Sequence, residues 1–270
     1  MAALVRLTAI YERRGFDIST GLNPAHVYGE PLAPFTYLFK NGEAWSEAAG
    51  IAVQELYFFE ALAEAWHPRH ILIIGNSFGW SAVALALIFP QARVLAIDSC
   101  DETNTAQGLE MTNAIAAEEG LTNLLAVQGT SPDDLAQIAQ LHNHGPWDMI
   151  FIDGEHTPRQ VERDFRGGLS LAAPDALWLF HDALNFGLLE IIEQLGQECQ
   201  LIFQSLWRTP SGMACLVPQA LVTQVAPVLH AFSGSGAIFN HMRDMGRFGT
   251  GERLLKALSS YPGQPSPSPP

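Results

Sequence analysis

The central part of the chain alternates short apolar runs with longer stretches whose apolar residues recur at helical spacing. Short runs rich in Ile, Leu, Val and Phe are typical of strands that are covered on both faces. They predict strands at residues 71–74, 93–97, 124–128, 147–153, 176–181, 201–204 and 213–217. The stretches with helical spacing predict helices at residues 44–66, 82–87, 105–119, 133–141, 158–169 and 184–195.

Strands that alternate with helices predict an α/β fold with a doubly wound, mostly parallel, seven-stranded sheet of the Rossmann-like type. Only residues 207–212 join the last two strands, which is too short for a crossover helix. These strands are therefore expected to form an antiparallel hairpin at the sheet edge. A ligand site is expected beyond the C-terminal ends of the parallel strands.

The remaining segments differ from this core in composition. Residues 1–43 contain Pro24, Pro31 and Pro34 without clear periodicity, so we expect an N-terminal arm or cap, irregular or with short helices, that could mediate homodimerisation. Residues 44–218 would form the main domain, and residues 219–260 a C-terminal helical or loop extension. The tail at 261–270, rich in Pro and Ser, is expected to be disordered.

Charge and cysteine usage exclude several partners. The chain of 270 residues has 28 acidic and 14 basic residues, a net charge of −14, which argues against nucleic acid and anionic membranes as partners. Cys100, Cys199 and Cys215 are odd in number and lack metal-site spacing, which favours reduced thiols in the cytoplasm. Neither a signal peptide nor an apolar run of membrane-spanning length is evident.

The turn between residues 71–74 and 82–87 carries the first chemical signal. Gly75 and Gly79 bracket it, and a glycine turn between a strand and a helix brings backbone N–H groups up to a ligand. The same residues read G-x-S-x-G, the nucleophile elbow of serine hydrolases, with Ser77 as nucleophile. Asp98 ends the next strand, 23 positions after Gly75, close to the spacing of a carboxylate that binds ribose hydroxyls. Asp98 therefore favours a nucleotide-type site.

The second signal is a pair of polar segments that follow two strands expected to be neighbours. Asp153 and His156 follow one strand, and His181 and Asp182 follow the other. Asp153 and Asp182 could share a divalent cation such as Mg²⁺ or Mn²⁺. Since His181 offers an imidazole beside them, this set of ligands would also suit Fe²⁺ and Zn²⁺. Such a cation would lower the pKa of a bound hydroxyl.

The segments IIGNSFGWS, AIDS, VQGTS, WDMIFIDGEH and LWLFHD, taken in this order, resemble the class I S-adenosylmethionine-dependent methyltransferases. Within them, the chain is similar to small-molecule O-methyltransferases of the macrocin, mycinamicin and catechol types over roughly residues 45–217. The resemblance implies a Rossmann-like methyltransferase fold, S-adenosylmethionine as cofactor and His156 as general base, a role that suits an imidazole. Ile74 and Ser77 depart from the family's glycine motif, where an acidic residue and a glycine are usual.

The resemblance also implies which residues contact the cofactor and which act in catalysis. The implied cofactor-binding residues are Gly75, Asn76, Ser77, Gly79, Trp80, Ser81, Asp98, Ser99, Gly129, Thr130, Ser131 and Asp153. The catalytic set is His156, Asp153 and His181, and the metal set is Asp153, His181 and Asp182. For Ser131, a role as N-cap of the following helix, with Pro132 at its first position, is an equal alternative.

The predicted function is methyl transfer from S-adenosylmethionine to a hydroxyl of a small metabolite, such as a sugar, phenol or polyketide. A serine hydrolase is the first alternative, because Ser77, Asp153 and His181 occur in the order of its triad, although it offers no role for Asp98 or Asp182. A nucleotide-fold protein that binds without catalysis is the second. Acceptor-binding residues are expected in residues 1–43 and around Phe239, His241, Met242 and Phe248.

Overall fold

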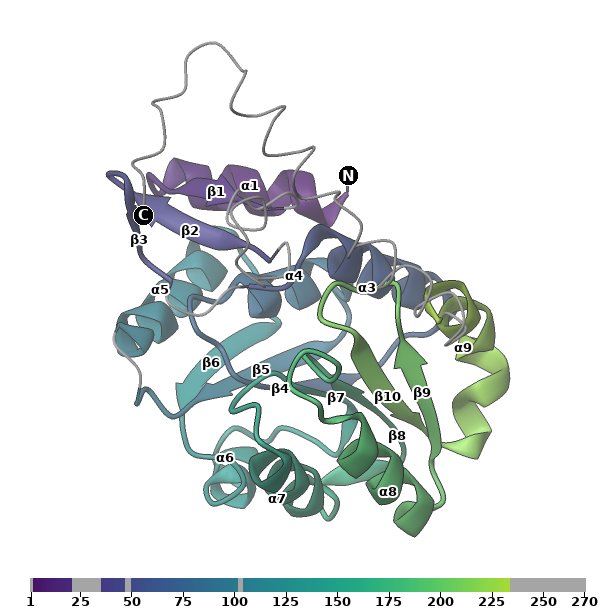
Figure 1. The fold of residues 1–270 in the computed structure, drawn as a ribbon. Helices are drawn as coiled ribbons and strands as arrows, with labels where there is room; N and C mark the ends of the chain where they lie inside the picture. Colours follow the sequence, from purple (N-terminus) through teal and green to yellow (C-terminus); the bar gives the residue numbers. More distant parts are fainter. Residues whose placement is uncertain (1, 21–34, 47–49, 102–103, 234–270) are drawn as a thin grey trace, which may run out of the picture.

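A computed structural model describes residues 2–20, 35–46, 50–101 and 104–233 of the chain (Figure 1). Its main element is a seven-stranded sheet with the strand order β6-β5-β4-β7-β8-β10-β9. Its strands are β4 (His70–Ile74), β5 (Arg93–Asp98), β6 (Leu124–Gln128), β7 (Trp147–Ile152), β8 (Ala172–Phe180), β9 (Ile202–Leu206) and β10 (Met213–Val217). The strands from β6 to β8 pair in parallel, whereas β10 pairs antiparallel with both β8 and β9. The predicted sheet and its antiparallel edge hairpin are confirmed.

Helices cover both faces of this sheet (Figure 1). They are α3 (Val53–Ala65), α4 (Trp80–Ile88), α5 (Thr105–Glu118), α6 (Leu135–Leu141), α7 (Pro158–Gly168) and α8 (Leu189–Cys199). Successive residues of β4 point to opposite faces, as a strand requires. Ile71 and Ile73 pack with the side of α3, α4 and α5, while Leu72 and Ile74 pack with that of α6, α7 and α8. The sheet therefore lies between two hydrophobic cores and is rigid enough to position the loops at its edge.

The N-terminal segment is more regular than the sequence indicated. Residues Ala3–Arg13 form α1, and β1 (Asp17–Ser19), β2 (Tyr37–Lys40) and β3 (Glu43–Ala44) form a small antiparallel sheet. Leu7 and Tyr11 of α1 are fully buried in the core that also holds α3 and α4. Figure 1 shows α1 and this small sheet together on the α4 side of the main sheet.

Three predicted helix starts were wrong because a strand or a turn takes the first residues. The helix predicted from residue 44 begins at Val53, since residue 44 lies in β3. The helix predicted from residue 133 begins at Leu135, with Asp134 and not Ser131 as its N-cap residue, because the Asp134 carboxylate closes a turn on the Thr130 N–H. The helix predicted from residue 184 begins at Leu189, after a turn.

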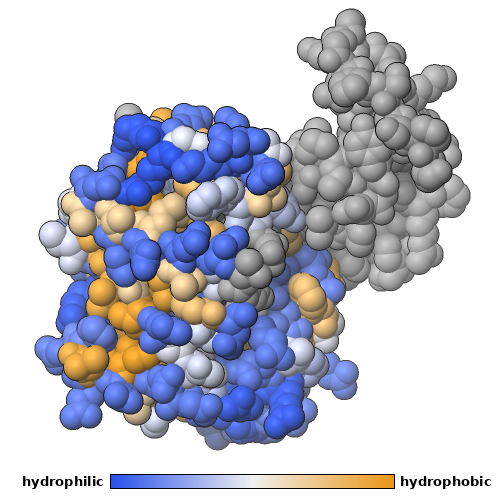
Figure 2. All heavy atoms as spheres, turned by 90° about the vertical axis from the view of Figure 1, so that its left-hand side faces the viewer, coloured by the Kyte–Doolittle hydropathy of each residue, from blue (hydrophilic) through white to orange (hydrophobic). Residues whose placement is uncertain are grey.

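After the main sheet, α9 (Gln219–Phe232) packs against α3, β8 and β9. The predicted acceptor residues after position 233 and the tail at 261–270 lie outside the described residues. No described helix combines the length and the apolar character needed to cross a bilayer. Figure 2 shows a largely hydrophilic face on which apolar side chains gather mainly at the left of the view.

Candidate functional site

The register of the sheet brings the predicted site residues to one edge. Ile74 of β4 pairs with Ile97 of β5 and with Ile152 of β7, and Ile152 pairs with Phe180 of β8. The residues that directly follow these positions are Asp98, Gly75, Asp153 and His181. Parallel strands end at the same edge, so the glycine turn lies between the carboxylate of β5 and the polar cluster of β7 and β8.

The turn after β4 packs so closely against its neighbours that glycine is needed at two positions. Gly75 has φ +102°, and a Cβ there would lie 2.1 Å from the backbone oxygen of Asp153. Gly79 has φ +78°, and a Cβ there would lie 2.1 Å from Thr112 Oγ1 on α5. Both φ values lie in the left-handed region that glycine adopts without steric cost. The backbone of the turn is thus held tightly between β7 and α5.

Ser77, at the position where a glycine is usual in the methyltransferases that the sequence resembles, also adopts a left-handed conformation, with φ +46°. A residue with a Cβ pays a steric cost in this region. The turn keeps the conformation that a glycine would give it, because other contacts hold it in place. One of them is the approach of Gly108 of α5, where a Cβ would lie 2.0 Å from the Ser77 carbonyl oxygen.

The carboxylate of Asp98 is the main support of this turn. Its Oδ2 accepts backbone N–H bonds from Asn76 and Ser77, at 2.9 and 2.8 Å, and its Oδ1 accepts the N–H of Cys100 at 2.9 Å. A carboxylate has about four lone-pair sites, so one site on Oδ1 is left for a ligand hydroxyl. Asp98 therefore orders the turn and can still accept one hydrogen bond from a ribose.

The side-chain amide of Asn76 supports the same turn. Its Nδ2 donates to the Ser77 carbonyl at 2.8 Å and to Thr112 Oγ1 at 3.0 Å, and the side chain is buried. Sequence analysis missed Gly108 and Thr112, four residues apart on one face of α5. A glycine followed four residues later by a hydroxyl residue indicates that a helix packs closely against a neighbour. The sequence does not indicate that this neighbour is the glycine turn.

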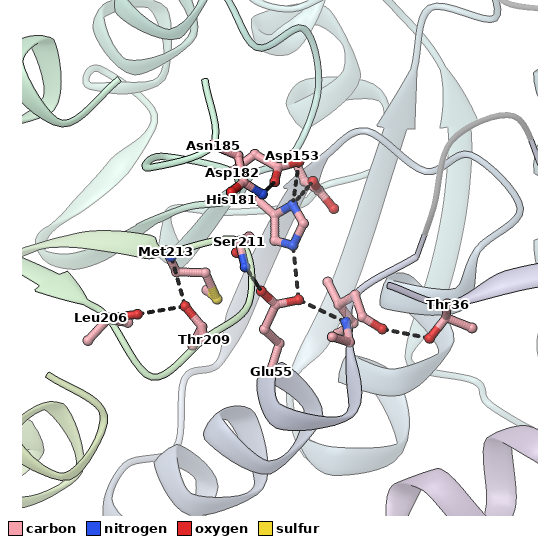
Figure 3. Close-up of polar contacts among 12 residues, drawn as sticks. Thr36, Glu55, Asp153, His181, Asp182, Asn185, Leu206, Thr209, Ser211 and Met213 are labelled. Atoms are coloured by element: carbon pink, nitrogen blue, oxygen red, sulfur yellow. Dashed lines mark hydrogen bonds and ion pairs between the residues drawn. The ribbon is translucent and has the colours of Figure 1, made fainter. Parts of the chain in front are cut away.

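His181 is the centre of the polar cluster (Figure 3). Its Nδ1 lies 2.8 Å from Asp153 Oδ1 and 3.3 Å from Asp182 Oδ2, and its Nε2 lies 3.0 Å from Glu55 Oε2. The side chain is only 3% exposed. Asp182 has φ +52° and accepts a hydrogen bond from Asn185 Nδ2 at 2.9 Å. The residues predicted after β7 and β8 therefore do converge.

His156 lies at the open side of this cluster. Its Nε2 is 3.8 Å from Asp153 Oδ1 and 3.6 Å from Asp182 Oδ2, and its ring stacks on Phe186 with centroids 4.7 Å apart. Phe186 itself is 56% exposed. Glu155, which the sequence placed outside the site, is exposed and accepts a hydrogen bond from Thr157.

Glu55 was missed by sequence analysis, although it is fully buried and contacts the cluster. It lies in the first turn of α3, where its Oε2 also accepts the backbone N–H of Ala52 at 2.8 Å. Its Oε1 accepts hydrogen bonds from the backbone N–H of Ser211 at 3.2 Å and from the Ser211 hydroxyl. A Glu at the third helical position is a capping signal, yet the contact with His181, 126 positions away, has no signal in the sequence.

The charges of the cluster shift the pKa values of its members. Burial raises the pKa of Asp153, but the charge of His181 and the nearness of both imidazole rings outweigh burial, so the pKa is lowered. Burial lowers the pKa of His181, but the charges of Asp153 and Glu55 outweigh it and raise the pKa well above its ordinary value. The site therefore favours a positive charge at the centre of its carboxylates.

The donor set fits a divalent cation. Asp153, His156 and His181 each present a ligand atom, and these three atoms lie within 4.8 Å of one another. Nδ1 of His181 and Nε2 of His156 are buried, and neither makes a hydrogen bond of ordinary geometry within the described residues. Asp182 Oδ2 lies beside both nitrogens. Two imidazole nitrogens that face two carboxylates offer the mixed nitrogen and oxygen ligands that a divalent cation can take up.

Other predicted cofactor residues lie around the glycine turn and the neighbouring loop. The Trp80 side chain is 3% exposed and packs on Tyr11 of α1, so it faces the core. Ser81 is buried in the first turn of α4. Ser99, Gly129, Thr130 and Ser131 follow β5 and β6, and Gly129 N–H donates to the Asp98 carbonyl at 2.9 Å.

Comparison with known proteins agrees with this geometry. Residues 72–183 match the family model described as "Methyltransferase domain". A catechol O-methyltransferase of Niastella koreensis is 26% identical over 146 residues, which are 54% of this chain and 63% of that protein. The chain thus aligns with somewhat under two thirds of the length of this curated relative.

Solved structures share the fold. The cofactor-bound protein Rv0187 from MTB has a TM-score of 0.54 and 19% identity over 80% of this chain and 88% of its own. The O-methyltransferase TomG from Streptomyces achromogenes has a TM-score of 0.50 and 23% identity over 63% of this chain and 81% of its own.

The sheet order, the glycine turn and the acidic residue after β5 define a Rossmann-like methyltransferase fold. With the matching domain over residues 72–183, the chain is similar to the S-adenosylmethionine-dependent methyltransferases, and the Niastella relative is one of their small-molecule O-methyltransferases.

Proposed function

We propose that this chain transfers a methyl group from S-adenosylmethionine to a hydroxyl of a small metabolite. The observation that carries the proposal is the arrangement of one sheet edge, where a turn held by Asp98 lies next to the cluster of Asp153, His156, His181 and Asp182. A cofactor site beside a base and a cation site is what O-methylation requires. The O-methyltransferase names of the Niastella and Streptomyces relatives support it, and TomG was solved in complex with SAM.

For the cofactor, the chain offers a backbone cradle and one carboxylate. S-adenosylmethionine supplies the reactive methyl group when bound. Gly75 to Gly79 and the N-terminus of α4 would line its methionine part, and the remaining acceptor site on Asp98 Oδ1 would take a ribose hydroxyl. Ser99 and the loop at 129–131 would lie near the ribose and the adenine. Asp153 would close this site from β7.

For the acceptor, the chain offers a base and a set of cation ligands. Asp153, His181 and Asp182 would hold a divalent ion, which would lower the pKa of the acceptor hydroxyl. His156 Nε2, at the open side of the cluster, would take the hydroxyl proton as the methyl group moves. The exposed ring of Phe186 keeps the His156 ring in place by stacking. The remaining catalysis would come from alignment of the acceptor oxygen with the methyl group.

The acceptor class, partners and location are also proposals. Sugar, phenol and polyketide hydroxyls all suit the chemistry, and no nucleic acid or membrane partner is expected at a net charge of −14. The three cysteines are free in the described structure, which supports a reducing, cytoplasmic location. Homodimerisation through residues 1–43 stays a prediction.

The serine-hydrolase alternative is less well supported. Its general base would have to contact the Ser77 hydroxyl. Both ring nitrogens of His181 face carboxylates instead, and His156 Nε2 faces Asp153 and Asp182. Labelling of Ser77 by a fluorophosphonate would favour this alternative over methyl transfer.

The test is a methyl-transfer assay with purified protein, S-adenosylmethionine and a panel of catechols, phenols, sugars and macrolides, with formation of S-adenosylhomocysteine as the readout. We expect turnover with at least one hydroxylated acceptor, lost in Asp182→Ala and on treatment with EDTA. Turnover that neither EDTA nor Asp182→Ala changes would refute the cation. Cofactor binding without turnover of any acceptor would favour the non-catalytic alternative.

A further inference from the structure

Glu55 lies behind His181, on the side away from His156, and its surroundings are unusual for a buried acidic residue. Four polar groups contact its two oxygens, and three of them are the backbone N–H groups of Ala52 and Ser211 and the ring Nε2 of His181 (Figure 3). The fourth is the Ser211 hydroxyl. Backbone N–H groups can only donate, so both oxygens of Glu55 must accept. This set of donors fits an ionised carboxylate.

This arrangement fixes which nitrogen of His181 carries a proton. Because Glu55 Oε2 already accepts from Ala52 and has no proton to donate, His181 Nε2 at 3.0 Å must be the donor. When a cation takes the place of the second ring proton, the lone pair that binds it therefore belongs to Nδ1. Nδ1 is the nitrogen that faces Asp153 and Asp182 and lacks a hydrogen bond of ordinary geometry. The lone pair therefore points at the carboxylates where a cation would lie.

The rest of the cluster supports the same geometry. The His181 ring contacts Phe35 and Phe151, with centroids 5.3 and 5.9 Å away, and its backbone N–H donates to the Ile152 carbonyl at 3.0 Å. The ring cannot turn without losing the Glu55 bond inside a buried apolar setting. In many metal sites, one ring nitrogen of a histidine binds the ion while the N–H of the other donates to a carboxylate, which orients the ring. Nε2 of His181 and Glu55 have this arrangement.

We propose that Glu55 is a positioning residue that presents Nδ1 of His181 as a nitrogen ligand, and that the site therefore selects a divalent transition metal, such as Mn²⁺, Fe²⁺ or Co²⁺, over Mg²⁺. Imidazole nitrogen is a ligand that these ions accept well, whereas Mg²⁺ prefers an all-oxygen set. The proposal rests on the proposed function for the use of the ion, but not for its binding, which is measured without any acceptor or cofactor.

The experiment measures metal affinity of the full chain by calorimetry with CoCl₂, MnCl₂ and MgCl₂, and nitrogen coordination by the hyperfine coupling of bound Mn²⁺. His181→Asn replaces the nitrogen with an oxygen at a similar place. Glu55→Gln keeps the shape of residue 55 but removes the charge and one acceptor. Glu64→Gln, at an exposed position of the same helix, is the matched control. Circular dichroism checks that each variant is folded.

We expect one metal ion per chain and a nitrogen signal on Mn²⁺. In His181→Asn this signal should decrease, and at least tenfold of the Co²⁺ preference over Mg²⁺ should be lost. Glu55→Gln should weaken Co²⁺ binding by about 10- to 100-fold, as loss of a partner that orients a ligand does, and Glu64→Gln should match the wild type. An unchanged Co²⁺ to Mg²⁺ ratio in His181→Asn, or unchanged Co²⁺ affinity in a folded Glu55→Gln, would overturn the proposal.

Failure of this inference and failure of the proposed function give different results. Binding of S-adenosylhomocysteine with no binding of any metal would overturn the metal proposal alone. Metal binding that follows the expected pattern, with no binding of S-adenosylhomocysteine, would overturn the proposed function and leave the metal site standing. His181→Asn also covers the case in which Glu55→Gln does not fold, since it tests the nitrogen ligand directly.

Discussion

Replacement of Asp98 by Asn tests whether one carboxylate both orders the glycine turn and serves the cofactor. Asn can keep the two bonds from Asn76 and Ser77 on its single oxygen. Its NH₂ group then faces the N–H of Cys100, which loses its acceptor. An N–H group left without an acceptor, here that of Cys100, costs about 1–3 kcal/mol of folding stability. The hydrogen bonds from Asn76 and Ser77 each weaken by roughly 1 kcal/mol, because their acceptor is no longer charged.

Because Asp98 is partly exposed, water offsets some of this loss. We therefore expect a decrease in the free energy of unfolding of about 2–3 kcal/mol, which lowers the melting temperature by roughly 4–12 °C for a chain of this size. Urea unfolding with an unchanged m value measures the first quantity. Calorimetry with S-adenosylhomocysteine should show at least a tenfold loss of affinity in the folded variant.

Asp101→Asn is the control, since Asp101 is an exposed acidic residue three positions further along the same loop. It should match the wild type in both measurements. The reasoning would be refuted by an Asp98→Asn protein that unfolds within 0.5 kcal/mol of wild type, or by one that binds S-adenosylhomocysteine as tightly as the control does.

Three further predictions concern the base, a buried acid and the N-terminal helix. His156→Gln should lower kcat by about 10²- to 10⁴-fold, as loss of a general base does, while a normal affinity for S-adenosylhomocysteine excludes damage to the turn; a kcat within threefold of wild type would remove His156 from that role. Asp164 is buried and accepts a bond from Gln160 Nε2 at 2.8 Å, and burial raises its pKa to about 6. Because the folded state then holds this proton more tightly than an unfolded chain with a pKa near 4, the wild type should lose on the order of 2 kcal/mol between pH 4 and 6. Asp164→Asn should lack this loss, so its stability relative to wild type should rise over that range in urea titrations; parallel pH profiles would contradict this. Tyr11→Phe removes the bond from the buried hydroxyl to the Phe78 carbonyl at 2.9 Å, which should cost about 1–2 kcal/mol, and thermal unfolding would show no change if α1 did not support the turn.

Most of the sheet could be predicted because its strands are short apolar runs bounded by turns. The parallel order predicts from sequence alone that Asp98, Asp153 and His181 lie at one edge, since strand ends in such folds meet on one side. Helix starts were less predictable. Residues 182–187 form a turn that starts with Asp182 at φ +52° and ends with Gly187 at φ +69°, and neither value can be read from the apolar pattern.

The contacts between distant segments were beyond sequence reasoning. Glu55 and His181 are 126 positions apart, and Tyr11 and Phe78 are 67 apart. Each pair depends on how α3 and α1 pack on the sheet, which local propensity does not fix. The same packing makes the histidine next to Asp182 a fixed, buried side chain rather than an exposed one.

Calorimetric titration of the purified wild-type chain with S-adenosylhomocysteine tests the central claim most directly, because it needs neither the acceptor nor the metal. The account predicts saturable binding of one molecule per chain, which is weakened in Asp98→Asn and unchanged in Asp101→Asn. Absence of any binding heat at millimolar ligand, with a chain that circular dichroism shows to be folded, would contradict the assignment of this sheet edge as a methyltransferase site.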